Sequence, residues 1–125
     1  MVDGGVTAAK GYVACGISAG IKKQGRDLAI VFSPSPAHGA AVFTTNCVQA
    51  APILLSRRRL ALARGQVQAI LMNSGCANAC TGSKGLNDAV RTGRCLAAHL
   101  GSLMGAFASV SRLVQNLTFP FRVRQ

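Results

Sequence analysis

Residues 67–101 read VQAILMNSGCANACTGSKGLNDAVRTGRCLAAHLG, and they contain the strongest structural signal in the chain. The apolar run 67–72 is typical of a buried strand, and a turn of small and amide residues follows it at 73–82. Gly101 is expected to end the next element, a helix. Its apolar face is predicted to contain Leu86, Ala89, Val90, Leu96, Ala97 and Leu100. This order of strand, turn and covering helix is typical of a layered α/β domain.

The turn at 73–82 combines flexible backbone with uncharged polar side chains. We single out six of its residues as support for a site: Asn73, Ser74, Gly75, Asn78, Thr81 and Gly82. The two glycines permit positive φ angles, and the amides and hydroxyls supply hydrogen-bond donors and acceptors. Such a turn can line a site for a polar ligand, or it can simply cap the helix start, as Asn, Ser and Thr often do. Both interpretations stay open at this point.

The rest of the chain alternates strand and helix signals without a linker or a repeat. The further predicted elements are a strand over 27–33, a strand over 39–46 and a helix over 53–64. Proline lacks an amide donor, so the sequence Ser33-Pro34-Ser35-Pro36 predicts a turn that ends the second strand. Pro52 suits the first residue of the helix, and Gly65 suits its C-terminal cap. We therefore expect one α/β domain of sheet and helix layers.

Composition and length are consistent with one compact domain. The chain has 125 residues, half of them hydrophobic, with five Phe, one Tyr and no Trp. Its core must therefore consist mainly of Ala, Val, Leu and Ile. No apolar stretch reaches the roughly 18 residues of a membrane-spanning helix, so we expect no membrane span.

The charge balance is strongly basic. Fourteen Lys and Arg face three Asp and no Glu, which gives a net charge of +11. Such a chain attracts polyanions, and Arg57–Arg59, Arg122 and Arg124 are candidate phosphate contacts. Because the chain has no helix-turn-helix, zinc-finger or RNA-binding signature, nucleic-acid binding is the weaker hypothesis. An acidic partner polypeptide is the other explanation of the charge.

The five cysteines form an odd set without a secretory context: Cys15, Cys47, Cys76, Cys80 and Cys95. We therefore expect reduced thiols. The spacing of Cys76 and Cys80 permits zinc, yet a second pair is missing and His38 and His99 are distant in sequence. We expect no metal site, and we expect the thiols to be small buried side chains packed against the strand.

Four sequence blocks, taken together, point to one family. They are 5–12 with 19–23, 42–46, 50–57, and 70–75 with 77–82. In order and spacing, from about residue 5 to 101, they resemble the ornithine acetyltransferase family, also called the bifunctional glutamate N-acetyltransferases of arginine biosynthesis. The last block is the most specific. Members of the family usually carry Asn at the position of Cys76.

The resemblance implies a fold of sheets layered between helices and an acyl-transfer activity. Family members cleave themselves into α and β chains that form a heterotetramer, and the N-terminal Thr of the β chain is the nucleophile. An acetyl group passes from N2-acetylornithine to this Thr and then to glutamate. No metal or prosthetic group takes part, although some members also accept acetyl-CoA. The location implied is the cytoplasm of a bacterium, or the plastid or mitochondrial matrix of a eukaryote.

The resemblance ends near Gly101, so we divide the chain into an α-chain-like region, 1–101, and a divergent tail, 102–125. The family continues into a Thr-Gly oxyanion segment, whereas residues 108–112 read ASVSR. We therefore assign no catalytic or substrate-binding residue. Thr44, Thr45 and Thr81 are expected to be strand or turn residues, since none has an evident base. A frameshift, a retained intron or alternative splicing would produce this ending, and we expect the chain alone to be inactive.

Three functional hypotheses follow. The leading one makes the chain the front part of an N-acetyltransferase that works only with the missing remainder. The second makes it an α-like fragment that binds a β-like chain, which co-elution with such a chain would support. The third is a basic nucleic-acid-binding module, whose affinity would fall steeply with salt.

Overall fold

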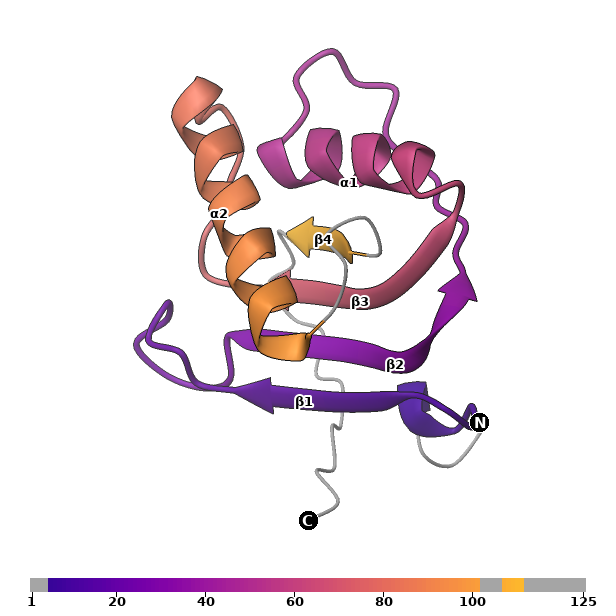
Figure 1. The fold of residues 1–125 in the computed structure, drawn as a ribbon. Coiled ribbons are helices and arrows are strands. Elements are labelled where there is room, and N and C mark those ends of the chain that lie inside the picture. Colours follow the sequence, from indigo (N-terminus) through magenta and orange to yellow (C-terminus); the bar gives the residue numbers. More distant parts are fainter. Residues whose placement is uncertain (1–4, 102–106, 112–125) are drawn as a thin grey trace.

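A four-stranded sheet forms the base of the domain (Figure 1). The computed structural model describes residues 5–101 and 107–111. A short 3-10 helix, η1 (Gly5–Thr7), precedes the sheet. The strands are β1 (Val13–Ile17), β2 (Leu28–His38), β3 (Gln66–Asn73) and β4 (Phe107–Ser111), and they lie in this order across the sheet. The first three are antiparallel neighbours, and β4 is parallel to β3. Parallel neighbours need a crossover connection, which is usually a helix, and a helix does lie between β3 and β4 in the chain.

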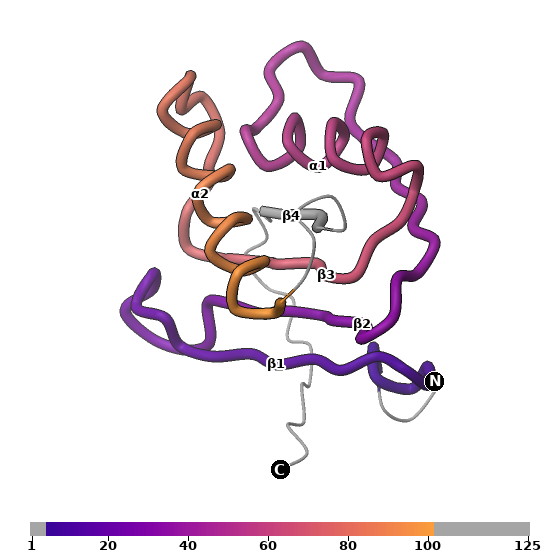
Figure 2. Tube along the Cα trace, in the orientation of Figure 1, coloured from indigo at the N-terminus to yellow at the C-terminus, as the bar shows by residue number. Residues whose placement is uncertain are grey.

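Two helices form the second layer. α1 (Ala51–Leu62) contacts β4 and α2 (Gly82–Leu100). α2 follows β3 and precedes β4 in the chain, and Figures 1 and 2 show it lying across the strands of the sheet. The predicted apolar face of α2 is confirmed, since Leu96 and Leu100 pack against the sheet. Gly101 ends this helix with a φ of 61°, as expected. The predicted layered α/β architecture and the strand over 67–72 are therefore confirmed.

The α1 region also follows its sequence signals. Pro52 lies in the first turn of the helix, where its missing amide costs nothing. The chain leaves the helix through Arg64 (φ 50°) and Gly65 (φ 79°), and the Gly65 amide donates to the Leu60 carbonyl over 2.9 Å. The helix therefore ends two residues before the predicted limit, with Gly65 in the capping region as expected.

The core is thin. Ala69 and Leu71 of β3 are 2% and 9% exposed, and Phe32 and Ile30 lie opposite them on β2. Among the described residues, no large side chain is fully buried. Several large apolar side chains are instead exposed, namely Val13, Ile17, Val42, Val48, Leu54 and Leu62. Because little apolar surface is removed from water, we expect marginal stability and a tendency to aggregate.

The predicted turn at residues 33–36 is wrong. β2 continues through this segment, and its register against β3 shifts there: Phe32 pairs with Ala69, whereas Ala37 pairs with Val67. Residues 33–36 therefore lie opposite Gln68 alone. An irregularity of this kind accommodates prolines, because the residues in it need not donate to the ladder. Gln68 Nε2 donates to the Pro34 carbonyl over 3.1 Å, which satisfies an acceptor that the ladder leaves unpaired.

The predicted strand over 39–46 is also wrong. Residues 40–46 have no regular secondary structure and belong to the long segment between β2 and α1. Local side-chain contacts replace ladder pairing: the Asn46 amide donates to Thr44 Oγ1 (3.1 Å), and the Val48 amide donates to Asn46 Oδ1 (2.9 Å). Such contacts compete with strand formation. Arg57 closes the segment onto α1, because it donates to the Thr44 carbonyl over 3.2 Å.

The expectation of buried thiols is wrong as well. All five cysteines are free and exposed. Cys76 and Cys80 lie on the turn after β3, and Cys95 lies off the apolar face of α2, so none of these three can pack into the sheet. Within residues 5–101 and 107–111, no group of three or more His, Cys, Asp or Glu side chains is arranged to hold a metal ion.

In the part of the chain that the structure describes, no helix has the length and apolar character required to cross a membrane.

Candidate functional site

A cavity of about 550 Å³ lies beneath the turn 73–82. Three of the six predicted site residues line it: Asn73, Asn78 and Thr81. Its apolar wall includes Ile21, Leu28 and Leu71. The size suits a small organic molecule, and the combination of an apolar wall with a few polar groups is typical of ligand sites.

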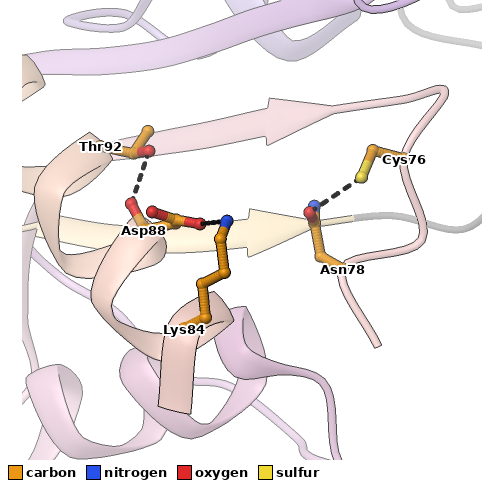
Figure 3. Close-up of polar contacts among 5 residues, drawn as sticks. All are labelled: Cys76, Asn78, Lys84, Asp88 and Thr92. Atoms are coloured by element: carbon orange, nitrogen blue, oxygen red, sulfur yellow. Dashed lines mark hydrogen bonds and ion pairs between the residues drawn. The ribbon is translucent and has the colours of Figure 1, made fainter. Parts of the chain in front are cut away.

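Three side chains of the turn form a hydrogen-bonded row. Asn78 Nδ2 donates to Asn73 Oδ1 over 3.1 Å. The Cys76 thiol donates to Asn78 Oδ1 over 3.2 Å, and Figure 3 shows this second bond. Asn78 has a φ of 52°, in the left-handed region, which Asn tolerates better than most residues. The turn thus orders its own amides around the end of β3.

The other three predicted site residues shape the turn without lining the cavity. The Ser74 amide donates to the Asp27 carbonyl over 2.9 Å, and Gly75 and Gly82 have φ angles of 91° and 58°. Thr81 precedes α2 without a side-chain capping bond, so it does not serve as a conventional N-cap. The structure therefore brings Asn73, Asn78 and Thr81 together, and their role in a site stays a prediction.

Sequence reasoning missed Asp27, which joins the turn to the loop between β1 and β2. Asp27 is 3% exposed. Oδ1 accepts the Ala19 amide (2.6 Å), and Oδ2 accepts the amides of Ile21 (2.6 Å) and Lys22 (2.9 Å). These bonds, first that from Ala19, hold the pKa of the Asp27 carboxyl below its ordinary value. A lone carboxylate directly after a glycine-rich loop was the available signal.

Lys84 and Asp88 form a charged rim of the cavity, which was not predicted from the sequence. Lys84 Nζ lies 3.0 Å from Asp88 Oδ2 in a pair one helical turn apart, and Thr92 Oγ1 donates to the Asp88 carbonyl over 2.9 Å (Figure 3). All three residues line the cavity from α2. The Lys84 side chain is 88% exposed, so water screens the pair and it adds little to stability. The rim therefore offers one cation and one anion to a ligand.

The site lies at the carboxyl ends of two parallel strands. β3 ends at Asn73, which pairs with Ser111 at the end of β4. Ligands of α/β sheets often bind where neighbouring parallel strands end. Residues 108–111, which by the resemblance correspond to the oxyanion segment of the family but lack its Thr-Gly pair, thus lead to the same edge as the turn. Thr44 and Thr45 do not line the cavity.

Gly75 is a sharp test of the turn's geometry. A Cβ at this position would overlap the Lys22 side chain, and its φ of 91° disfavours any L side chain. We expect Gly75→Ala to lower the free energy of unfolding by about 1–3 kcal/mol. Gly82→Ala is the matched control, since it shares the positive φ but would meet nothing within 4 Å. Urea unfolding would measure both, and equal losses would contradict the proposed contact with Lys22.

The comparisons with known proteins agree on one family. A sequence model described as the ArgJ family matches residues 13–112. The Arginine biosynthesis bifunctional protein ArgJ of Gloeobacter violaceus is 50% identical over 101 residues, which cover 80% of this chain and 25% of that protein. A protein of the same name from Bacillus cereus is 40% identical over 121 residues, covering 97% of this chain and 29% of that protein.

Two solved structures have the same fold. The crystal structure of ArgJ from Bacillus halodurans has a TM-score of 0.83 at 40% identity, and the match covers 92% of this chain and 60% of that chain. The ornithine acetyltransferase of Mycobacterium tuberculosis, solved in complex with ornithine, has a TM-score of 0.80 at 38% identity over 92% of this chain and 62% of that chain.

The fold and the turn thus define the N-terminal α/β region of a biosynthetic enzyme class. The chain belongs to the ArgJ family. It spans about a quarter of the length of the curated relatives that it matches. The family match extends to residue 112, and β4 lies within the segment that we separated as a tail; the boundary at residue 101 stays a prediction.

Proposed function

We propose that this chain is the N-terminal part of an ornithine acetyltransferase, which transfers an acetyl group from N2-acetylornithine to glutamate in arginine biosynthesis. The observation that carries the proposal is the 0.80 TM-score, over 92% of the chain, to the ornithine acetyltransferase solved with ornithine. The naming of the other relatives as bifunctional arginine-biosynthesis proteins supports it.

The partner in this proposal is the remainder of the enzyme, a β-like chain whose N-terminal Thr is the nucleophile. The matched region makes up 60% of a solved ArgJ chain but about a quarter of full-length relatives. A solved chain that is much shorter than the full-length relatives agrees with maturation into two chains. The exposed apolar side chains are surface that this remainder would cover. Assembly as an α/β heterotetramer belongs to the same proposal.

In this chemistry the Thr hydroxyl attacks the acetyl carbonyl and releases ornithine, and glutamate then takes the acetyl group from the Thr ester. The free α-amine of an N-terminal Thr serves as the base for its own hydroxyl. Backbone amides and a polar side chain stabilise the oxyanion. The proposal includes no metal or prosthetic group, and acetyl-CoA enters only as a second acetyl donor in the bifunctional reaction. The odd number of cysteines, five, supports a reducing compartment.

Complementation tests the proposal directly. The chain would be co-expressed with the part of the Gloeobacter violaceus relative that lies beyond the matched region, and transfer of labelled acetyl from N2-acetylornithine to glutamate would be measured. We expect no transfer by the chain alone and transfer by the co-purified pair. The remainder expressed alone is the control. A stable pair that transfers no acetyl group would contradict the proposed activity.

A further inference from the structure

The direction of hydrogen bonding in the turn determines how the Asn73 amide faces. The Cys76 thiol is the donor to Asn78 Oδ1, so the nitrogen of the Asn78 amide is the group that faces Asn73. Asn78 Nδ2 accordingly donates to Asn73 Oδ1. With its oxygen engaged on this side, Asn73 turns its two N–H donors away from Asn78.

These donors belong to a residue that lines the cavity. Asn73 is half-buried at the end of β3, on the same side of the sheet as its register partner Leu28. Among the described residues, no group accepts a hydrogen bond from Asn73 Nδ2. Asn73 Nδ2 is also accessible. Among the described residues, the only side-chain polar atom that is both buried and without a partner is Gln49 Oε1, so Asn73 Nδ2, which has no partner, is not buried. An acceptor that enters the cavity can therefore reach the Asn73 amide.

We propose that Asn73 binds the ligand of this cavity, and that the ligand is a small molecule with a carbonyl or carboxylate oxygen beside an aliphatic chain. The oxygen accepts from Asn73 Nδ2, and the chain lies on the apolar wall that Leu28 and Leu71 provide. Cys76 and Asn78 are positioning residues: their two hydrogen bonds hold the Asn73 nitrogen toward the ligand. A volume of about 550 Å³ accommodates such a molecule.

The inference goes beyond the proposed function because it assigns a ligand contact to a numbered residue of this chain. The end of β3 at Asn73 lies beside the end of β4 at Ser111, so Asn73 lies at the edge of the sheet where residues 108–111 correspond, by the resemblance, to the oxyanion segment of the family. The choice of N2-acetylornithine as the probe below rests on the proposed function. The geometry itself requires only an oxygen acceptor.

The experiment is a titration of the 125-residue chain, labelled with ¹⁵N at the asparagine side chains, with N2-acetylornithine. The Asn73→Asp variant identifies the Asn73 signal by its disappearance. We expect a saturable shift of the Asn73 side-chain amide in the unmodified chain. Butylammonium, which has an aliphatic chain but no oxygen acceptor, should leave it in place. An Asn73 signal that stays unchanged while other signals saturate would overturn the inference, as would an equal response to butylammonium.

Variants separate contact from positioning. Asn73→Asp replaces the donor by an acceptor of the same shape and is expected to weaken binding about tenfold or more. Asn87→Asp, on the exposed face of α2, is the matched control and should bind normally. Cys76→Ala removes the donor to Asn78 and should reduce affinity a few-fold, whereas Cys76→Ser keeps a donor and should restore it. Unchanged affinity of Asn73→Asp would remove Asn73 from the site.

The two proposals can fail separately. If the complementation assay shows no acetyl transfer while the Asn73 amide still responds to the probe, the activity is wrong and the binding inference holds. If acetyl transfer occurs and Asn73→Asp retains both affinity and KM, the activity holds and the binding inference is wrong.

Discussion

Replacing Asp27 with asparagine is expected to lower the melting temperature by several degrees at neutral pH and to release the loop 18–26 from the turn. One carboxylate accepts three backbone amides here, and two of them bind the same oxygen. An asparagine side chain has an NH₂ group in place of one carboxylate oxygen. This NH₂ group, a donor, would then face a backbone N–H, which is also a donor. At least one of the three amides then loses its acceptor, and the new NH₂ group is placed at a buried residue against another donor, which is costly.

The stabilisation by Asp27 is also expected to depend on pH. The pKa of Asp27 is lowered in the folded chain, first by the amide of Ala19. The carboxylate therefore stabilises the fold above the unfolded pKa of about 4, and this contribution is lost as the pH falls through the lower folded value. Melting curves followed by circular dichroism between pH 7 and pH 2 would show this loss in the unmodified chain, and it should be absent in Asp27→Asn.

Asp88→Asn is the matched control for this experiment. Asp88 carries the same group in an exposed pair with Lys84, so its substitution should change the melting temperature little. If Asp27→Asn and Asp88→Asn melt alike at neutral pH, Asp27 does not hold the loop.

Truncation of Leu71 is expected to abolish cooperative unfolding. Leu71 is 9% exposed in the centre of the sheet and forms the core with Ala69. Leu→Ala substitutions in cores cost about 2–5 kcal/mol, because apolar contact is lost and a cavity remains. A domain with so thin a core has little stability to lose, since even ordinary domains have only about 5–15 kcal/mol.

Urea titration monitored by circular dichroism would measure the effect of Leu71→Ala. Leu62→Ala is the control: Leu62 is 69% exposed at the end of α1, and we expect a change within about 0.5 kcal/mol. A cooperative Leu71→Ala transition with the midpoint of the unmodified chain would show that the core lies elsewhere.

Local sequence signals correctly predicted those strands and helices whose apolar residues are also the ones buried in the fold. The strand over 67–72 and the helix that ends at Gly101 are both confirmed, because apolar periodicity and a glycine cap agree with tertiary burial. The prolines at 34 and 36 are typical of a turn but lie within a strand here. They are compatible with β2 only because the register against β3 shifts at Gln68, and a register is a property of two strands.

The same distinction applies to the site. Its residues on the turn 73–82 could be named in advance, since glycines and amides after a buried strand are visible in the sequence. The contact of Asp27 with this turn could not be predicted, because Asp27 lies far from the turn in sequence and reaches it only through the hairpin of β1 and β2. The Lys84 and Asp88 rim was missed because pairs at this spacing are common on helix surfaces.

The sequence by itself determined the α/β class, the family resemblance and the position of the turn, since these depend on local periodicity, glycine positions and an ordered set of motifs. Only the tertiary structure decided that Asn73, Asn78 and Thr81 share a cavity with Leu28 and Lys84, and that Asp27 joins two loops. The physical reason is that hydrogen bonds and packing between distant segments depend on strand register and helix placement. No local pattern encodes these.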